Sequence, residues 1–217
     1  TGVYGADEVD EDHNPRQDAG KAAVNKGGPV GLFAAVFAML SGAGQVVVVD
    51  PSTVRLATAK NVGVDHTIAE ETSAGRIDAV LALTGGRGAD VTIEASGNPK
   101  AVPEGLAMTR DNGTYCIVGQ YTDAGDVNIN PHLHINKKHL DIRGVWGIDY
   151  SHFYKSVQLM ALHKKRFNWH RLISRYYPLE DVATAIEDVE AFVPDMAGSA
   201  RGKVVPADKF GSGPMKM

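Results

Sequence analysis

Residues 21–50 read KAAVNKGGPVGLFAAVFAMLSGAGQVVVVD, and this stretch decides the fold class. A weak apolar strand over 22–24 is followed by the loop Gly27-Gly28-Pro29-Val30-Gly31, by an apolar helix over 30–40 and by the four-valine strand 46–49. A continuous β-branched run indicates a strand covered on both faces, as in a parallel sheet between helices. The stretch therefore predicts an α/β fold.

The same alternation of strands and helices continues to about residue 150. A helix is expected over 51–62, with proline suited to its first turn, and another over 99–109, ended by the turn Asp111-Asn112-Gly113. Further short apolar segments lie at 77–83, 91–94, 115–118 and 140–146. Counted with the first two strands, they give six strands with helical crossovers, which is typical of a doubly wound parallel sheet of the Rossmann type.

The pattern divides the chain into three parts. Residues 1–20 form a polar leading segment or linker, with six acids between positions 7 and 20. Residues 21–150 form the Rossmann domain, and residues 151–217 form a C-terminal α+β extension that we expect to complete the sheet. The extension is expected to contain a helix near 153–165, a strand near 172–177, a helix over 179–192 and a short strand at 203–205.

Composition and charge exclude several classes of protein. Hydrophobic residues make up 43% and charged residues 22%, with a formal net charge of −4, so no nucleic-acid partner is expected. The longest apolar stretch, 30–40, is too short to span a bilayer, and the first residues lack the layout of a secretory signal. The single cysteine, Cys116, excludes an intrachain disulfide and a multi-cysteine zinc site. We expect a cytoplasmic protein without a membrane partner.

The glycine loop and the acid after the valine strand indicate a dinucleotide site. Gly28 permits close approach of a pyrophosphate, Gly31 lets helix and strand pack closely, and the amino end of the helix attracts the phosphate charge. Asp50 follows Gly31 by 19 residues, where a carboxylate accepts hydrogen bonds from the adenosine ribose. The same carboxylate repels a 2′-phosphate, which favours NAD over NADP. Lys26 replaces the first glycine of the usual motif and adds positive charge near the phosphates.

Plainer interpretations of these residues stay open. The loop could be an ordinary strand-to-helix turn, with Asp50 as the N-cap of the next helix. Arg55, one turn into that helix, either stacks on the adenine or lies in solvent.

Motifs spread over about 22–205 resemble the coenzyme-binding half of the zinc-type alcohol dehydrogenases, the medium-chain dehydrogenase/reductase family. They read GPVGL at 28–32, VVVVDPS at 46–52 with RLA at 55–57, GVDHTI at 63–68, GADV at 88–91, EASG at 94–97, GTYCIVG at 113–119 and RGVWG at 143–147. The resemblance implies an NAD-dependent oxidoreductase that moves a hydride between a secondary alcohol and NAD. It also implies a homodimer joined through the nucleotide-binding domains.

The resemblance further implies a set of cofactor-binding residues, in the glycine loop and at the ends of the later strands. They are Gly28, Pro29, Val30 and Gly31 at the pyrophosphate, Asp50 at the ribose, Arg55 beside the adenosine, Ser96, Gly97, Val118 and Gly119 along the cofactor, and Val145 and Trp146 near the nicotinamide. Alternatively, Ser96-Gly97 and Val118-Gly119 are simple strand-ending turns, and Trp146 is a core residue.

The family's catalytic zinc ligands and its four-cysteine lobe belong to an amino-terminal domain that we do not find in this sequence. We therefore expect the NAD-binding portion of an alcohol or polyol dehydrogenase, inactive or nearly so alone, whose residues 151–217 pack toward the missing catalytic domain. The sequence indicates no catalytic residue within these 217 residues. The alternative is a non-catalytic nucleotide-binding or interaction module of Rossmann fold.

Other chemistries find less support in the sequence. His132, His134 and His139 form a close histidine cluster, but their spacings do not place all three on one helix face, and two lysines lie between them. We therefore predict no metal site. A short-chain dehydrogenase would need a tyrosine and a lysine four residues apart, which do not occur. A methyltransferase shares the glycine loop and the acid, and retention of S-adenosylmethionine would support it.

The C-terminal extension is expected to lack packing partners without the other domain. An exposed apolar patch that favours self-association would result. Its expected members are Leu172, Ile173, Ile186, Phe192, Val204 and Val205.

Overall fold

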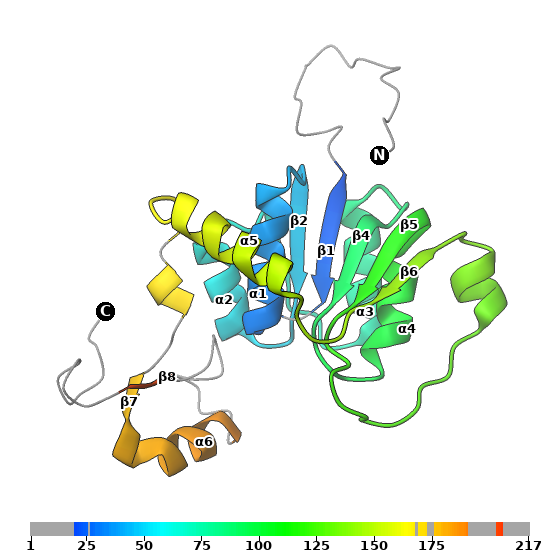
Figure 1. Ribbon diagram of the computed structural model, residues 1–217. Helices are drawn as coiled ribbons and strands as arrows, with labels where there is room; N and C mark the ends of the chain where they lie inside the picture. The colour runs from blue at the N-terminus through cyan, green and yellow to red at the C-terminus, as the bar shows by residue number, and fades with distance from the viewer. Residues whose placement is uncertain (1–19, 26, 168, 173–175, 191–202, 206–217) are drawn as a thin grey trace.

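The computed structural model describes residues 20–25, 27–167, 169–172, 176–190 and 203–205. The strands are β1 (Lys21–Asn25), β2 (Gln45–Val49), β3 (His66–Ile68), β4 (Ala89–Glu94), β5 (Thr109–Ile117), β6 (Asp141–Gly144), β7 (Tyr176–Pro178) and β8 (Lys203–Val205) (Figure 1). The α-helices are α1 (Pro29–Leu40), α2 (Thr53–Asn61), α3 (Ser73–Leu83), α4 (Ala101–Met108), α5 (Tyr150–Leu162) and α6 (Val182–Glu190). Short helical turns are η1 (His132–Asn136), η2 (Trp169–Leu172) and η3 (Leu179–Asp181).

The first six strands form one parallel sheet in the order β3-β2-β1-β4-β5-β6. Strands are added outward from β1 on one side and outward from β4 on the other, so the chain crosses the centre of the sheet between β3 and β4. Parallel neighbours need crossover connections, and α1, α2, α3 and α4 supply them between successive strands. The predicted α/β class and the doubly wound Rossmann sheet are confirmed.

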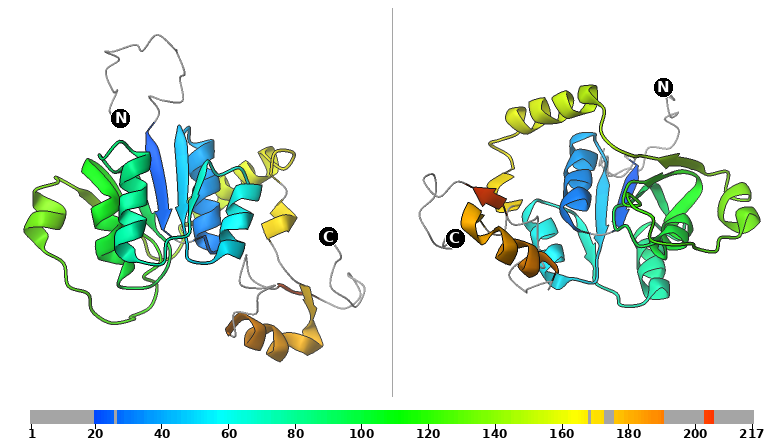
Figure 2. Two further views of the ribbon diagram at one scale, coloured as in Figure 1. Left: turned by 180° about the vertical axis from the view of Figure 1, so that it is seen from behind. Right: turned by 60° about the horizontal axis from the view of Figure 1, so that its bottom comes forward.

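Alternating side chains on the central strands fill a core on each face of the sheet. Val46 and Val48 pack in one cluster with residues of α1 and α2, and Val47 and Val49 pack in another with residues of α3 and α4. Figure 2 shows these two helix pairs on opposite faces. All four valines are at most 1% exposed, so the prediction of a strand covered on both faces is correct.

The count of six strands is correct, but the apolar segment 77–83 is not one of them. It belongs to helix α3, whose N-cap Thr72 accepts a hydrogen bond from the Gly75 N–H at 3.1 Å. The third strand is β3, which has three residues and lies at an edge of the sheet. Its sequence, His-Thr-Ile, has only one fully buried side chain, so no apolar run marks it.

The turn expected at 111–113 lies inside β5 instead of before it. Thr109 pairs with Ala89 and Thr114 pairs with Val91, so the β5 chain advances five residues while β4 advances two. Asn112, at a φ of 56°, allows this excursion. The turn chemistry is therefore present, but it forms a bulge within a strand rather than a boundary between elements.

The C-terminal extension does not complete the main sheet within the part of the chain that the structure describes. Strands β7 and β8 pair with each other in a parallel two-stranded sheet, which lies with α6 apart from the six-stranded sheet (Figures 1 and 2). Each is only three residues long, and pairing with the other satisfies the backbone groups that one of its edges presents. The expected helices near 153–165 and 179–192 are present as α5 and as η3 with α6.

The expected apolar patch of the extension is correct in one described position and wrong in another. Ile186 is 56% exposed, whereas Leu172 is 3% exposed because it packs in the core cluster beneath α1 and α2. Ile173 and Phe192 lie outside the described residues, as does the acidic segment 7–19. No helix among the described residues is both long enough and apolar enough to cross a membrane.

Candidate functional site

The carboxyl ends of β1, β2, β4 and β5 meet at one edge of the sheet, the lower edge in Figure 1. Asn25, the last residue of β1, pairs with Val49 on one side and with Glu94 on the other, and Glu94 pairs in turn with Ile117. The segments that follow these residues therefore emerge side by side. The order of the strands reverses between β1 and β4, and open α/β sheets bind ligands at such a reversal.

The glycine loop opens α1 with a free helix end. Gly28 is the N-cap, and α1 starts at Pro29 with no acidic residue in its first turn. The α2, α3 and α5 helices differ, because a side chain caps each of them. A Cβ on Gly28 would meet no atom within 4 Å, so the space beside this residue is open. Lys26 lies outside the described residues.

Asp50 lies directly after β2 and holds the glycine loop. Its Oδ2 accepts a hydrogen bond from the Gly27 N–H at 2.8 Å, and its Oδ1 accepts one from the Ser52 N–H at 2.7 Å. The N-cap of α2 is Ser52, whose hydroxyl accepts from the Arg55 N–H, so the interpretation of Asp50 as that cap is wrong.

Arg55 lies over the Asp50 carboxylate, with its Nη1 3.5 Å from Oδ2. The Asp50 side chain is 0% exposed and the Arg55 side chain 18% exposed, so Arg55 is neither free in solvent nor distant from the acid.

Glu94, which the sequence analysis did not single out, is a second buried carboxylate at this edge. It is 0% exposed at the end of β4. Its Oε1 accepts from the Ser96 N–H and hydroxyl, both at 2.6 Å, and from the Gly97 N–H at 3.0 Å. Its Oε2 accepts from the Gly119 N–H at 3.2 Å. The available signal was an acid that ends an apolar strand just before a Ser-Gly turn.

The segments after β4 and β5 lie against each other. Gly97 has a φ of 70°, which favours glycine, and a Cβ there would lie 2.9 Å from the Gly119 carbonyl oxygen. A Cβ on Gly119 would lie 2.5 Å from both the Gly97 and the Ser96 backbone nitrogens. The structure thus brings together Ser96, Gly97, Val118 and Gly119, which the sequence placed only at separate strand ends.

Val145 and Trp146 follow β6 beside these segments. The Val145 N–H donates to the Ile117 carbonyl at 3.0 Å. Trp146 is 77% exposed, so its interpretation as a core residue is wrong. Its ring stacks on Tyr121 with centroids 5.4 Å apart, and its Nε1 donates to the Tyr121 carbonyl at 3.3 Å.

The described residues do not fit a zinc ion. Among them, no three or more His, Cys, Asp or Glu side chains come close enough to hold a metal. His134 accepts a hydrogen bond at Nδ1 from the Asn130 N–H, and the Lys138 ammonium donates to the Leu106 carbonyl of α4 at 2.7 Å. Burial raises the pKa of the Cys116 thiol, which opposes formation of a thiolate.

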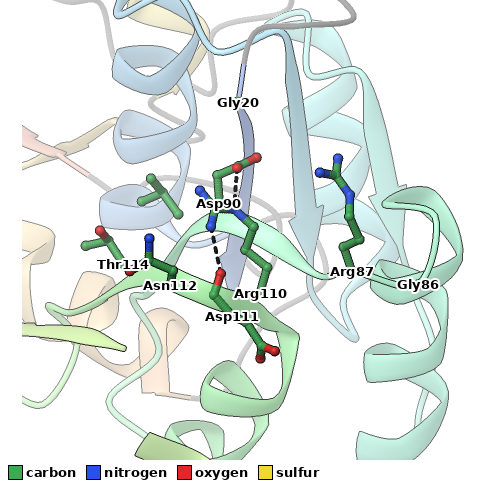
Figure 3. Close-up of a pocket in the computed structure, with 9 residues that line it drawn as sticks. Gly20, Gly86, Arg87, Asp90, Arg110, Asp111, Asn112 and Thr114 are labelled. Atoms are coloured by element: carbon green, nitrogen blue, oxygen red, sulfur yellow. Dashed lines mark hydrogen bonds and ion pairs between the residues drawn. The ribbon is translucent and has the colours of Figure 1, made fainter. Parts of the chain in front are cut away.

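A pocket of about 850 Å³ lies at the opposite, amino-terminal edge of the sheet (Figure 3). In it Asp90 accepts hydrogen bonds from the Lys21 N–H at 2.6 Å and from Arg110 Nε at 2.5 Å. Burial by itself raises the pKa of Asp90, but these two partners, with the charge of Arg87, outweigh it and lower the pKa below its ordinary value of 3.8. The ion pair ties β1, β4 and β5 together, and its opposite charges make the pocket a poor match for a pyrophosphate.

Comparison with known proteins identifies the family of this chain. The zinc-binding dehydrogenase family model matches residues 29–162. The chain belongs to this family. Among solved structures of the fold, an alcohol dehydrogenase from Thermotoga maritima has a TM-score of 0.76 and 28% identity, covering 89% of this chain and 53% of that one. A chain from Sinorhizobium meliloti 1021 that is bound to NADP has a TM-score of 0.73 and 26% identity, covering 87% of this chain and 53% of that one.

Curated relatives of this zinc-binding dehydrogenase chain are alcohol and polyol dehydrogenases. The 5-exo-hydroxycamphor dehydrogenase of Pseudomonas putida is 34% identical over 170 residues, which cover 77% of this chain and 47% of the relative. The sorbitol dehydrogenase of Rattus norvegicus is 36% identical over 174 residues, which cover 77% and 45%. The chain thus spans less than half the length of these relatives and corresponds to the coenzyme-binding part of the family. A non-catalytic Rossmann module is not favoured.

Proposed function

We propose that this chain binds NAD(H) at the carboxyl edge of its sheet, as the coenzyme-binding portion of a zinc-type alcohol or polyol dehydrogenase. One observation supports this most strongly. The open amino end of α1, the buried Asp50 that holds the glycine loop, and the paired segments after β4 and β5 all surround the point where strand order reverses. Open α/β sheets bind dinucleotides at this point.

The adenosine half of the coenzyme lies over β1, β2 and α1 in this proposal. The pyrophosphate contacts Gly28, Pro29, Val30 and Gly31, where the first N–H groups of α1 and its dipole favour an anion. The ribose hydroxyls bind Asp50 after Arg55 turns away from Oδ2, and Arg55 then lies along the adenosine. The Asp50 carboxylate disfavours a 2′-phosphate, so NAD binds in preference to NADP.

The nicotinamide half lies over β4, β5 and β6. Ser96, Gly97, Val118 and Gly119 border its ribose, and Val145 and Trp146 approach the ring. NAD supplies hydride acceptance when bound, in the oxidation of a secondary alcohol to a ketone. The described residues contribute binding and orientation, because no three or more of their His, Cys, Asp and Glu side chains come together to hold a metal ion that would polarise the alcohol oxygen. We infer that the chain alone turns over no alcohol.

Titration with NADH tests the proposed function. We expect saturable binding to the 217-residue chain at micromolar to sub-millimolar NADH, and weaker binding of NADPH. S-adenosylmethionine serves as the comparison ligand. Absence of NADH binding up to about 1 mM, or preferential binding of S-adenosylmethionine, would contradict the proposal.

We further propose a cytoplasmic homodimer. The strand β6 supports the dimer, because it lies at an edge of the sheet and all four of its residues are exposed. The half-buried free thiol of Cys116 fits a reducing compartment. Sedimentation equilibrium with a proline substitution at Ile142 tests the dimer, since proline at an edge strand blocks strand pairing between copies.

A further inference from the structure

Glu94 is a buried carboxylate whose neighbours are hydrogen-bond donors from the two segments that follow β4 and β5. The donors are the N–H and hydroxyl of Ser96 and the N–H of Gly97 on one side, and the N–H of Gly119 on the other. A buried carboxylate is stable only when such donors replace its lost hydration. The side chain therefore fixes the position of both segments at once.

We propose that Glu94 is a positioning residue for the nicotinamide half of the coenzyme. This inference rests on the proposed function. Glu94 touches no coenzyme atom in the proposal; it acts by holding Ser96-Gly97 against Gly119, so that both segments present one preformed wall to the nicotinamide riboside. Preformed sites bind more tightly because less conformational freedom is lost on binding.

The absence of a Cβ at two glycines supports a fixed contact. The Gly97 and Gly119 backbones approach so closely that a Cβ on either would overlap the other segment. Such close contact fixes the relative position of the segments only while something holds them together. The Glu94 side chain does so through its bonds to both segments, and the Glu94 backbone carbonyl accepts from the Gly119 N–H as well, at 3.0 Å.

Asp50 has the corresponding place in the other half of the site. It holds Gly27 of the pyrophosphate loop as Glu94 holds Gly97 and Gly119. Asp50 directly follows β2 and Glu94 ends β4, and these two strands lie on opposite sides of β1. Loss of the Glu94 carboxylate should therefore disturb the nicotinamide half and leave the adenosine half intact.

The variant Glu94→Gln separates the two groups of donors. Its amide oxygen can replace Oε1 and accept from Ser96 and Gly97, but its NH2 group then faces the Gly119 N–H, which is also a donor. The turn at 96–97 is kept and the side-chain bond to Gly119 is lost, so that segment keeps only the backbone bonds from the Val118 and Gly119 N–H groups to the carbonyl of residue 94. Glu94→Asp retains the charge but is one methylene shorter, so it cannot reach both segments.

The experiment compares NADH with ADP-ribose, which lacks the nicotinamide, by calorimetric titration of the full 217-residue chain. For Glu94→Gln we expect about tenfold weaker NADH binding and unchanged ADP-ribose binding. Glu94→Asp should show the same selectivity with a smaller loss, which keeps the test available if the first variant folds poorly. If Glu94 only stabilised the fold, its replacement would lower the affinities for NADH and ADP-ribose by the same factor.

Glu104→Gln is the matched control, because Glu104 is also a buried carboxylate, 4% exposed, but pairs with Arg76 away from the site. It should lower the melting temperature and leave the ratio of NADH to ADP-ribose affinity unchanged. If Glu94→Gln loses affinity for NADH and ADP-ribose equally, or loses affinity for neither, the inference is overturned while the proposed function stands. A wild-type chain that binds neither ligand overturns the proposed function, and this inference with it.

Discussion

Gly28 and Gly105 show how differently two glycines of one chain respond to the same added methyl group. Beside Gly28 at the start of α1 the space is empty, whereas beside Gly105 in α4 it is filled by the ring of Tyr115. Nothing in the folded chain itself requires a glycine at position 28, where φ is −65°. We infer that the missing side chain matters there for a ligand, since the phosphates must approach the backbone closely.

Gly28→Ala should leave the fold intact and weaken NADH binding by about tenfold or more. Alanine is a poorer N-cap than glycine but lowers the entropy of the unfolded chain, so the free energy of unfolding should change by less than about 1 kcal/mol. Thermal melting and NADH titration measure the two effects separately. Gly20→Ala, at the opposite edge of the sheet, is the control and should bind NADH normally. Normal NADH binding by Gly28→Ala would place the pyrophosphate elsewhere.

The two buried carboxylates show what residue-level reasoning could and could not predict. Asp50 was predictable, because an acid after a valine run at a fixed distance from a glycine loop is a local pattern. Glu94 was not, because Gly119, one of its partners, is 25 residues away in the sequence. Its burial depends on the pairing of β4 with β5. The ion pair between Arg55 and Asp50 was not predictable either, since it depends on the direction in which α2 leaves β2.

At the scale of elements, helix α4 packs on β5 through the contact between Gly105 and Tyr115. A Cβ on Gly105 would lie 2.6 Å from the Tyr115 hydroxyl oxygen and 2.7 Å from Cζ, and the ring is 0% exposed, so it has no room to move. Alanine is favoured over glycine in a helix by about 1 kcal/mol. Overpacking of a rigid core outweighs this gain.

Gly105→Ala should therefore lower the free energy of unfolding by about 1–3 kcal/mol, which corresponds to several degrees in melting temperature. Gly75→Ala in α3 is the matched control, because its Cβ would meet only the side chains of Thr72 and Glu70, both exposed. That control should cost less stability than Gly105→Ala, because its tightest contact, 3.0 Å to the Thr72 hydroxyl, is with the end of an exposed side chain. Calorimetry measures the melting temperatures of the two variants. Equal melting temperatures would mean that α4 and β5 can separate slightly with little loss of stability.

The ion pair of Asp90 with Arg110 joins strands at the amino edge and carries a pH dependence. The pKa of Asp90 is lower in the folded chain than its ordinary value of 3.8, so the unfolded chain binds more protons in this range. The stability that Asp90 contributes is fully present above about pH 4 and is lost as the pH falls through the folded pKa.

Asp90→Asn should lower stability by roughly 1 kcal/mol at pH 7, since the Asp90 side chain is partly exposed and solvent screens the pair. The difference from wild type should shrink as the pH falls below about 4 and through the lowered pKa of Asp90, because protonation removes the same charge there. Chemical unfolding at several pH values measures this. Asp111→Asn, at an exposed position in the same pocket, should follow the wild-type curve. A constant difference across the pH range would show that the charge of Asp90 is not what stabilises the edge.

Element boundaries were harder to predict than element types. The four-valine strand and the helix after the glycine loop were predictable, because burial on both sides leaves a continuous apolar run. The edge strand β3 was missed, since His66 and Thr67 are only half-buried there. The segment 77–83 has a similar apolar content but forms the second half of helix α3, and the cap at Thr72 is the local feature that distinguishes it.

At the scale of the whole molecule, α5 has an apolar stripe that the rest of the described chain leaves uncovered. Tyr150, Phe153, Tyr154 and Val157 recur at helical spacing and are 79%, 52%, 54% and 48% exposed. The exposed patch expected from the sequence lies further along the extension, over residues 172–205, and does not include this helix. Whether a helix is covered depends on the path of the chain after β6, which no local pattern specifies.

We expect this stripe to make the chain self-associate as its concentration rises, because large apolar patches favour association. The double variant Phe153→Glu and Val157→Lys replaces two stripe residues on adjacent turns of α5 with oppositely charged side chains. These attract each other four residues apart on a helix, so the fold should be retained. Sedimentation velocity over a concentration series should show association of the wild type beyond the dimer proposed at β6, and at least about tenfold weaker association of this kind in the variant. The control pair Val182→Glu and Ile186→Lys alters exposed apolar residues one turn apart on α6, at 44% and 56% exposure. If the control pair removes association and the α5 pair does not, the α6 surface is responsible; if the wild type stays monomeric throughout, the α5 stripe does not drive association at all.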